Sequence, residues 1–154
     1  MVVIDTDVML LAFAFHRDLR QEANRRFLEA VQQRSPAMPI YAVMELLGQL
    51  SFNLSPQRLS EWPVWLQDRY GLTLLYPNTA NLEAEPFFEA EFVAGPFYRM
   101  QQYPMPYLDS LILNLVENAP DVEAFITWNA RHYQDKTVVP VRTPAEYSTG
   151  TVPA

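Results

Sequence analysis

The sequence predicts a single α/β domain built on a mainly parallel β-sheet. The chain has 154 residues, which is close to the usual size of one domain with one core. Residues 1–4 form a short β-branched apolar run, which is typical of a strand buried on both faces. Further along, strand-like segments alternate with helix-like segments, the arrangement that builds a parallel sheet covered by helices.

Caps and prolines mark the elements in the first half of the chain. Asp5 ends the first strand, and Pro36 breaks the helix that starts near Gln21. Ser55 is a good N-cap with a proline after it at the first helical position, and Pro63 is expected to kink or divide that helix. The expected elements are strands at 1–4 and 38–40, and helices at 7–15, 21–33 (apolar face Ala23, Phe27, Ala30 and Val31), 41–51 and 55–70.

Glycines and prolines also punctuate the second half. A strand follows Gly71, a weak point falls at Gly95, and Pro106 begins a strongly apolar helix. The expected elements are strands at 72–76, 123–127 and 137–140, helices at 78–100 and 107–118, and a helical turn at 129–133. The segment from Thr143 is rich in Thr, Ser, Gly and Pro, so we expect one domain over 1–142 and a flexible tail over 143–154.

Composition excludes several classes of protein. Hydrophobic residues make up 49% of the chain and charged residues 19%, as in a globular domain rather than a disordered one. The absence of cysteine excludes a disulfide scaffold, a thiolate metal site and a cysteine nucleophile. A net charge of -7 repels polyanions over long range, so binding of nucleic acid would need a bound cation, a local arginine cluster or a partner.

The apolar runs are short. The longest covers residues 8–15, whereas about 20 residues are needed to cross a bilayer. Two acids rather than a basic stretch precede it, unlike a secretory signal. We therefore expect no membrane association and a cytoplasmic location.

Four acids stand in apolar surroundings. Asp5 and Asp7 follow the first strand, and the carboxyl ends of strands in an open α/β sheet form the rim where ligands bind. Asp109 lies on a helix that is apolar around most of its circumference, and Glu45 on one with few polar neighbours. Each has a simpler structural explanation: an N-cap for the aspartate pair, a first-turn acid for Asp109, and a rim glutamate for Glu45.

Taken together, Asp5, Glu45 and Asp109 predict a metal site. Carboxylates brought together repel one another unless a cation lies between them. Oxygen-only ligands favour the hard ions Mg²⁺ or Mn²⁺. Such an ion activates water and stabilises the charge that builds up on a phosphodiester during hydrolysis.

The chain resembles the PIN domain family of metal-dependent ribonucleases, especially the small VapC-like toxins. Four segments carry the resemblance in order, from the first strand to the last: Val-Val-Ile-Asp-Thr-Asp-Val at 2–8, Val-Met-Glu-Leu-Leu at 43–47, Tyr-Leu-Asp-Ser-Leu-Ile at 107–112, and Phe-Ile-Thr-Trp-Asn-Ala-Arg-His-Tyr at 125–133. The resemblance implies a Rossmann-like, three-layer α/β/α sandwich with a mainly parallel sheet.

The resemblance also implies roles for particular residues. Asp5, Glu45 and Asp109 would be catalytic and would hold Mg²⁺ or Mn²⁺, while Thr6 and Thr127 would orient carboxylates or water. Relatives usually have Asn or Ser where this chain has Asp7, which could serve as a direct or an indirect metal ligand. Many relatives carry Asp near position 129, where this chain has Asn129, so a second metal ion is in doubt unless Asp7 compensates.

The implied activity is metal-dependent hydrolysis of RNA, in a toxin of a type II toxin–antitoxin pair or in a free-standing processing nuclease. The implied partners are an RNA substrate, an antitoxin protein and a second copy of the chain. The alternative from another class is a degenerate PIN-fold binding module without catalysis. An Asp-x-Asp phosphatase of the haloacid dehalogenase type matches residues 5–7, but Met9 and the lack of a late acidic pair count against it.

Side chains near these motifs have open roles. Arg17, Arg20, Arg25 and Arg26 either line the entrance to the crevice or form a solvated helix face. His132 is expected to pack or cap rather than catalyse. Trp128 is expected to pack in the core or at the rim.

Overall fold

The strand β1 (Val2–Ile4) lies at the centre of the sheet, and all of its residues are fully buried. It pairs in parallel with β2 (Pro36–Pro39) on one side and β4 (Ala124–Ile126) on the other. The edge strands β3 (Thr73–Leu75) and β5 (Val141–Arg142) are also parallel to their neighbours, giving the order β3-β2-β1-β4-β5. The structure is a computed structural model that describes residues 1–79 and 83–150. The predicted parallel sheet is confirmed.

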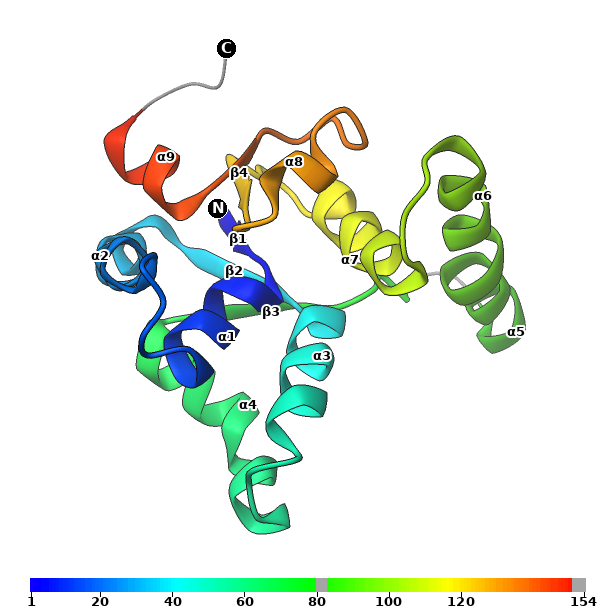
Figure 1. Cartoon of the computed structure of the whole chain (residues 1–154). Helices are drawn as coiled ribbons and strands as arrows, with labels where there is room; N and C mark the ends of the chain where they lie inside the picture. Colours follow the sequence, from blue (N-terminus) through cyan, green and yellow to red (C-terminus); the bar gives the residue numbers. More distant parts are fainter. Residues whose placement is uncertain (80–82, 151–154) are drawn as a thin grey trace.

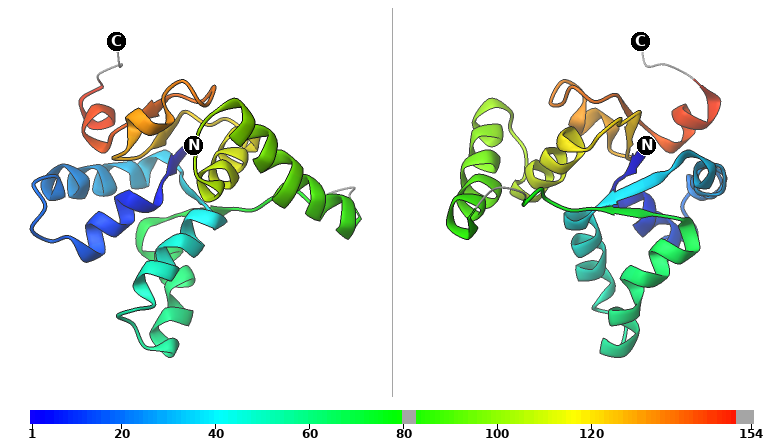
Figure 2. Two further views of the ribbon diagram at one scale, coloured as in Figure 1. Left: turned by 45° about the vertical axis from the view of Figure 1, so that its right-hand side comes forward. Right: turned by 180° about the vertical axis from the view of Figure 1, so that it is seen from behind.

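Helices cover both faces of this sheet. In Figure 1, α2 and α9 lie together on one side and α7 lies on the other, with α5 and α6 beyond α7. Figure 2 shows that α3 and α4 form a hairpin that projects away from the sheet. The helices are α1 (Thr6–Ala14), α2 (Gln21–Val31), α3 (Ile40–Leu50), α4 (Pro56–Tyr70), α5 (Ala84–Phe88), α6 (Gly95–Gln102), α7 (Tyr107–Asn118), α8 (Ala130–Tyr133) and α9 (Pro144–Thr149).

The core lies between the sheet and these helices. Its largest fully buried side chains include Phe27 from α2, Phe125 from β4 and Ile112 from α7. Burying one such side chain stabilises the fold by about 1.5–3 kcal/mol. Because β1 and β4 are buried on both faces, the polar residues that follow them are held at the edge of a rigid sheet.

Local sequence signals placed most boundaries correctly. The Ser55 side chain accepts a hydrogen bond from the Arg58 amide and caps α4, and Gly71 ends that helix in the left-handed conformation with φ of 65°. The helix is not divided at Pro63, where a break was one expectation, and continues to Tyr70.

The helix expected over 78–100 is different in the structure. Residues 78 and 79 are not helical, residues 80–82 lie outside the described part, and α5 begins at Ala84. The irregularity is a π-helical segment over Glu89–Ala94 rather than a break at Gly95. A Cβ atom at Gly95 would lie 2.8 Å from the Ala90 carbonyl oxygen and 3.2 Å from Asn114 Nδ2, so glycine is needed where α6 packs on α7.

Two expectations at the end of the chain were wrong. The last strand is β5 rather than 137–140, because Phe125 and Ile126 pair with Val141 and Arg142, and Val138 is 91% exposed. The expected tail from 143 is helical up to Thr149, and residues 151–154 lie outside the described part.

A capping box stabilises α9. The Thr143 hydroxyl accepts a hydrogen bond from the Glu146 amide, and the Glu146 carboxylate accepts one from the Thr143 amide at 2.7 Å. The helix then packs on α2, where the Tyr147 ring meets Phe27 edge to face. Composition indicated a tail, but this cap and the contact with α2 order the segment.

Within residues 1–79 and 83–150, no helix is both long enough and apolar enough to cross a membrane.

The cap on α9 gives a stability prediction. Thr143→Ala should lower the free energy of unfolding by about 1 kcal/mol, because the Glu146 amide loses its acceptor. Thr143→Ser keeps the hydroxyl and should match the parent protein within a few tenths of a kcal/mol. Urea unfolding followed by circular dichroism measures both variants, and equal stabilities of the two would contradict the capping role.

Candidate active site at the carboxyl edge of the sheet

Acidic and hydroxyl side chains gather where the parallel strands end. Asp5 follows β1, Thr127 follows β4, and α3, which carries Glu45, begins directly after β2. Because these strands run in the same direction, their carboxyl ends share one edge of the sheet. These side chains therefore lie at the edge of the sheet where the sequence predicts a site.

Asp5 is both an N-cap and a buried acid. Its Oδ1 accepts a hydrogen bond of 2.8 Å from the Thr6 amide at the start of α1, and the residue is only 5% exposed. Burial raises the pKa of Asp5 well above its usual range, and the negative charges of Asp7 and Glu45 raise it further. Hydrogen bonds from the Thr6 amide and the Thr127 hydroxyl oppose this rise. The capping role and the candidate catalytic role are therefore compatible.

Thr6 connects α1 to Glu45. Its hydroxyl donates to Glu45 Oε2 at 2.5 Å and lies 3.1 Å from the carbonyl oxygen of Ala42. Thr6 is 3% exposed and Glu45 is half-buried, so this contact fixes the glutamate on the side of α3 that faces Asp5. The expected role of Thr6 in orienting a carboxylate agrees with this geometry.

Asp109 reaches the site from the first turn of α7. Its Oδ2 lies 3.0 Å from His132 Nε2, but the pair lacks hydrogen-bond geometry. The buried Tyr133 lies on the same side of the site. Burial is the largest cause that raises the pKa of its phenol, and the charges of Asp5 and Asp109 come next. Asp5, Asp7 and Asp109 therefore all act electrostatically on one tyrosine.

Asp7, in the first turn of α1 after β1, is hydrogen-bonded to the loop that follows the neighbouring strand β4. Its Oδ2 accepts hydrogen bonds from the Thr127 hydroxyl at 2.9 Å and the Asn129 amide at 3.0 Å, and its Oδ1 accepts one from the Trp128 amide at 3.1 Å. Burial raises the pKa of Asp7, while these three donors and the charge of Arg20 oppose the rise. Both carboxylate oxygens are thus engaged by the loop that follows β4.

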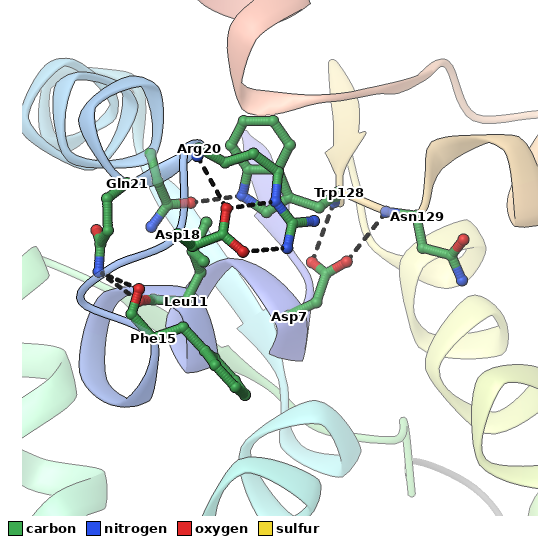
Figure 3. A network of polar contacts seen from close by, with 9 residues as sticks. Asp7, Leu11, Phe15, Asp18, Arg20, Gln21, Trp128 and Asn129 are labelled. Carbon is green, nitrogen blue, oxygen red and sulfur yellow. Dashed lines mark hydrogen bonds and ion pairs between the residues drawn. The ribbon is translucent and has the colours of Figure 1, made fainter.

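Asn129 takes part through its backbone. Its amide donates to Asp7, while its side chain points away from Asp7 into an exposed position (Figure 3). Asn129 therefore contributes an N–H donor from the main chain to Asp7.

A further polar network supports the loop from behind. The indole of Trp128 donates to Asn24 Oδ1 at 2.8 Å, and Asn24 Nδ2 donates to the Val8 carbonyl at 2.9 Å. Asn24 is fully buried on α2, whose buried face is Asn24, Phe27, Leu28 and Val31 rather than the expected 23, 27, 30 and 31. The hydrophobic pattern of the sequence did not identify Asn24 as buried, because the groups that bind its side chain lie on α1 and on the loop after β4.

The four arginines near the motifs have different settings, and Arg17 is exposed between α1 and α2. Arg25 and Arg26 form ion pairs with Glu22 and Glu29 on the exposed face of α2. Arg20 instead lies beside the site, with its guanidinium 5.5 Å from the centre of the Trp128 ring (Figure 3). The sequence alone did not distinguish between these two settings.

The carboxylates of the site are ligands that a hard cation prefers, but they are not spaced to surround one in this structure. The candidate ligands are all carboxylates, and the charges of Asp7 and Glu45, which act on Asp5, are what a cation would offset. Among residues 1–79 and 83–150, no three His, Cys, Asp or Glu side chains stand close enough together to hold a metal ion as placed. The glutamate on Thr6 and the aspartate beside His132 would have to turn toward Asp5.

The engagement of Asp7 gives a prediction. Asp7→Asn should lower the free energy of unfolding by about 1–3 kcal/mol, because an amide cannot accept all three hydrogen bonds. It should lower the affinity for Mn²⁺ by no more than about tenfold, because the oxygens of Asp7 are engaged by the loop and Asp7 acts on the site only through its neighbours. Urea unfolding and calorimetric Mn²⁺ titration test the two parts, and a large loss of Mn²⁺ affinity would instead make Asp7 a metal ligand that compensates for Asn129.

Comparisons with known proteins support the fold. No protein-family model matches the chain, and no curated protein matches it. Among solved structures, a chain from the crystal structure of VapBC2 from Rickettsia felis bound to a DNA fragment from their promoter is similar, with a TM-score of 0.58 and 15% identity. The match covers 93% of this chain and 98% of that chain, and at this identity it shows the fold alone. The predicted three-layer, PIN-like α/β/α sandwich is therefore confirmed as the fold of this protein.

Proposed function

We propose that this chain is a metal-dependent endoribonuclease of the PIN type that serves as the toxin of a type II toxin–antitoxin pair. The observation that carries the proposal is the set of acids at one edge of the sheet, in a fold shared with a VapBC2 chain. A partly buried edge that carries more negative charge than the neighbouring groups neutralise is poorly explained by stability alone, because acids removed from water without a cation destabilise a fold.

Asp5, Glu45 and Asp109 are the proposed catalytic residues and the proposed ligands of Mg²⁺ or Mn²⁺. Their donor chemistry fits such an ion, since all are carboxylates, and the burial of Asp5 excludes water from one side of the site. A divalent ion bound there would activate water and stabilise the charge that builds up on the phosphodiester.

Neutral donors hold Asp5, Glu45 and Asp7 in place. Thr6 donates to Glu45, the Thr6 amide donates to Asp5, and Thr127 lies between Asp5 and Asp7. Hydroxyls and amides orient carboxylates without cancelling their charge, so the acids keep their attraction for a cation. We propose Thr6, Asp7, Thr127 and the amide of Asn129 as positioning groups.

The toxin part of the proposal concerns partners. The neighbour in the comparison comes from a VapBC2 complex, and we propose an antitoxin protein as a partner of this chain. A partner that blocks the site would place a basic side chain among the acids and an apolar helix beside them. A second copy of the chain is a further proposed partner.

A non-catalytic binding module of the same fold is the second candidate. Two points favour it. In the described part of the chain no group of three acidic or histidine side chains is spaced to hold an ion as placed, and the chain has Asn129 where the resemblance implies an acid. A binding module would neither need an ion nor cleave RNA.

The first prediction tests the activity. Purified protein with Mn²⁺ or Mg²⁺ should cleave RNA in a mixed pool, and Asp109→Asn should reduce the rate by about 100-fold or more, because one carboxylate is lost from the site. Equal cleavage by both proteins would indicate a contaminating nuclease or a wrong site assignment. Cleavage by neither would favour the binding module.

The second prediction tests the ion without relying on activity. Mn²⁺ should raise the melting temperature of the parent protein, because a cation relieves the repulsion among the acids. Asp5→Asn, which keeps the cap on Thr6, should melt at or above the parent without metal and should lose most of the Mn²⁺ effect. Differential scanning calorimetry with Mn²⁺, and with Arg26→Gln as a surface control, measures this. An unchanged Mn²⁺ shift in Asp5→Asn would exclude Asp5 as a ligand.

A further inference from the structure

We propose that Arg20 binds a backbone phosphate of the RNA at the rim of the acidic site, next to the bond that is cleaved. This inference rests on the proposed function, since it concerns how that site holds its substrate. Three features of Arg20 support it: its side chain is held by Asp18 and Trp128, one edge of its guanidinium has no hydrogen-bond partner in the described part of the chain, and its charge acts on Asp7.

Asp18 fixes the direction of the guanidinium. Arg20 Nε donates to Asp18 Oδ1 at 2.9 Å, and Nη2 donates to Asp18 Oδ2 at 2.7 Å, as two parallel hydrogen bonds. The Arg20 amide also donates to Asp18 Oδ1 at 2.8 Å. These contacts hold the pKa of Asp18 down at about 2, so the pair stays ionised at neutral pH.

Trp128 supports the flat face of the guanidinium. The charge lies 5.5 Å from the centre of the indole ring, within the range of a cation–π contact. The indole is itself held by the buried Asn24, which is held by the main chain of α1. Arg20 is therefore oriented in the absence of substrate (Figure 3), which reduces the entropy lost on binding.

One edge of the guanidinium stays free. Within residues 1–79 and 83–150, Arg20 Nη1 has no hydrogen-bond partner, and the side chain is 50% exposed. The positive charge acts on Asp7, but the oxygens of Asp7 are bound to the loop rather than to Arg20. Arg20 therefore lies near Asp7 but is not hydrogen-bonded to it.

A phosphate is the ligand that suits this edge. The chain carries a net charge of -7, so an RNA strand approaching the acidic edge is repelled unless a fixed cation meets it. Arginine presents a planar fork of donors that matches phosphate oxygens. Arg25 and Arg26 are ion-paired as Arg20 is, but they lie on the exposed face of α2, whereas the charge of Arg20 acts on Asp7.

The test measures RNA binding as a function of salt. All proteins carry Asp109→Asn so that the RNA stays intact, and fluorescence anisotropy follows a labelled single strand of mixed sequence in Mg²⁺. Arg20→Gln should weaken binding about tenfold at about 50 mM salt and reduce the slope of log Kd against log salt by about 0.7, the value for one phosphate on a single strand. Arg20→Lys keeps the charge and should keep the slope.

Matched variants separate charge from structure. Arg26→Gln removes an arginine from the same helix and should leave affinity and slope unchanged. If Arg20→Gln has the same affinity and slope as Arg26→Gln, the proposal is overturned.

A parallel cleavage assay without Asp109→Asn distinguishes this proposal from the proposed function. Cleavage by the parent with unchanged KM in Arg20→Gln would overturn the role of Arg20 alone. An Arg20-dependent slope without any cleavage would support Arg20 and overturn the nuclease. If no protein binds or cleaves RNA, both are overturned.

Discussion

The hydrogen bonds from the loop after β4 to Asp7 are the interaction on which the rest of the site depends. They connect the carboxyl ends of the two central strands through residues about 120 positions apart in sequence. Through them Thr127 is held between Asp5 and Asp7, and Trp128 is placed against α2 and Arg20. Three donors from one short loop hold this partly buried carboxylate in place, although burial still raises its pKa. The loop in turn leads directly into α8, which carries His132 and Tyr133.

The electrostatic character of this edge follows from which donors lie near the acids. The contacts that orient Asp5, Asp7 and Glu45 come from hydroxyls and backbone amides, which direct a carboxylate but leave its charge in place. Burial makes that charge unfavourable, and proximity of like charges adds to the effect on Asp5. Arg20, held by Asp18, supplies positive charge at the rim rather than at the centre. This arrangement agrees with the proposed function, in which a cation binds among the acids and RNA binds at the rim beside Arg20.

Much of the fold could be predicted because the relevant signals are local. The apolar run of β1, the cap and proline that begin α4, and the apolar pattern of α7 each lie within one helix or one strand. The failures have a common cause in tertiary contact. Residues 137–139 are all β-branched, but the segment 137–140 lies outside the sheet, because the register with β4 places Val141 and Arg142 in the last strand. The segment from Thr143 has the composition of a tail but is ordered by packing on α2. The buried face of α2 includes Asn24, which a hydrophobic pattern cannot recognise as buried because its partners come from α1 and the loop after β4.

By itself, the sequence determined the fold class, the strand ends that carry Asp5 and Thr127, and the identity of the isolated acids Glu45 and Asp109, because each depends on residues close along the chain. Only the tertiary structure decided the partner of each acid: Thr6 for Glu45, His132 for Asp109, and the loop after β4 for Asp7. It also decided that Arg20, and not Arg25 or Arg26, stands beside the acids. The physical reason is that a hydrogen bond or ion pair needs two groups within a few ångströms, and for residues far apart in sequence that distance is set by how the strands and helices pack.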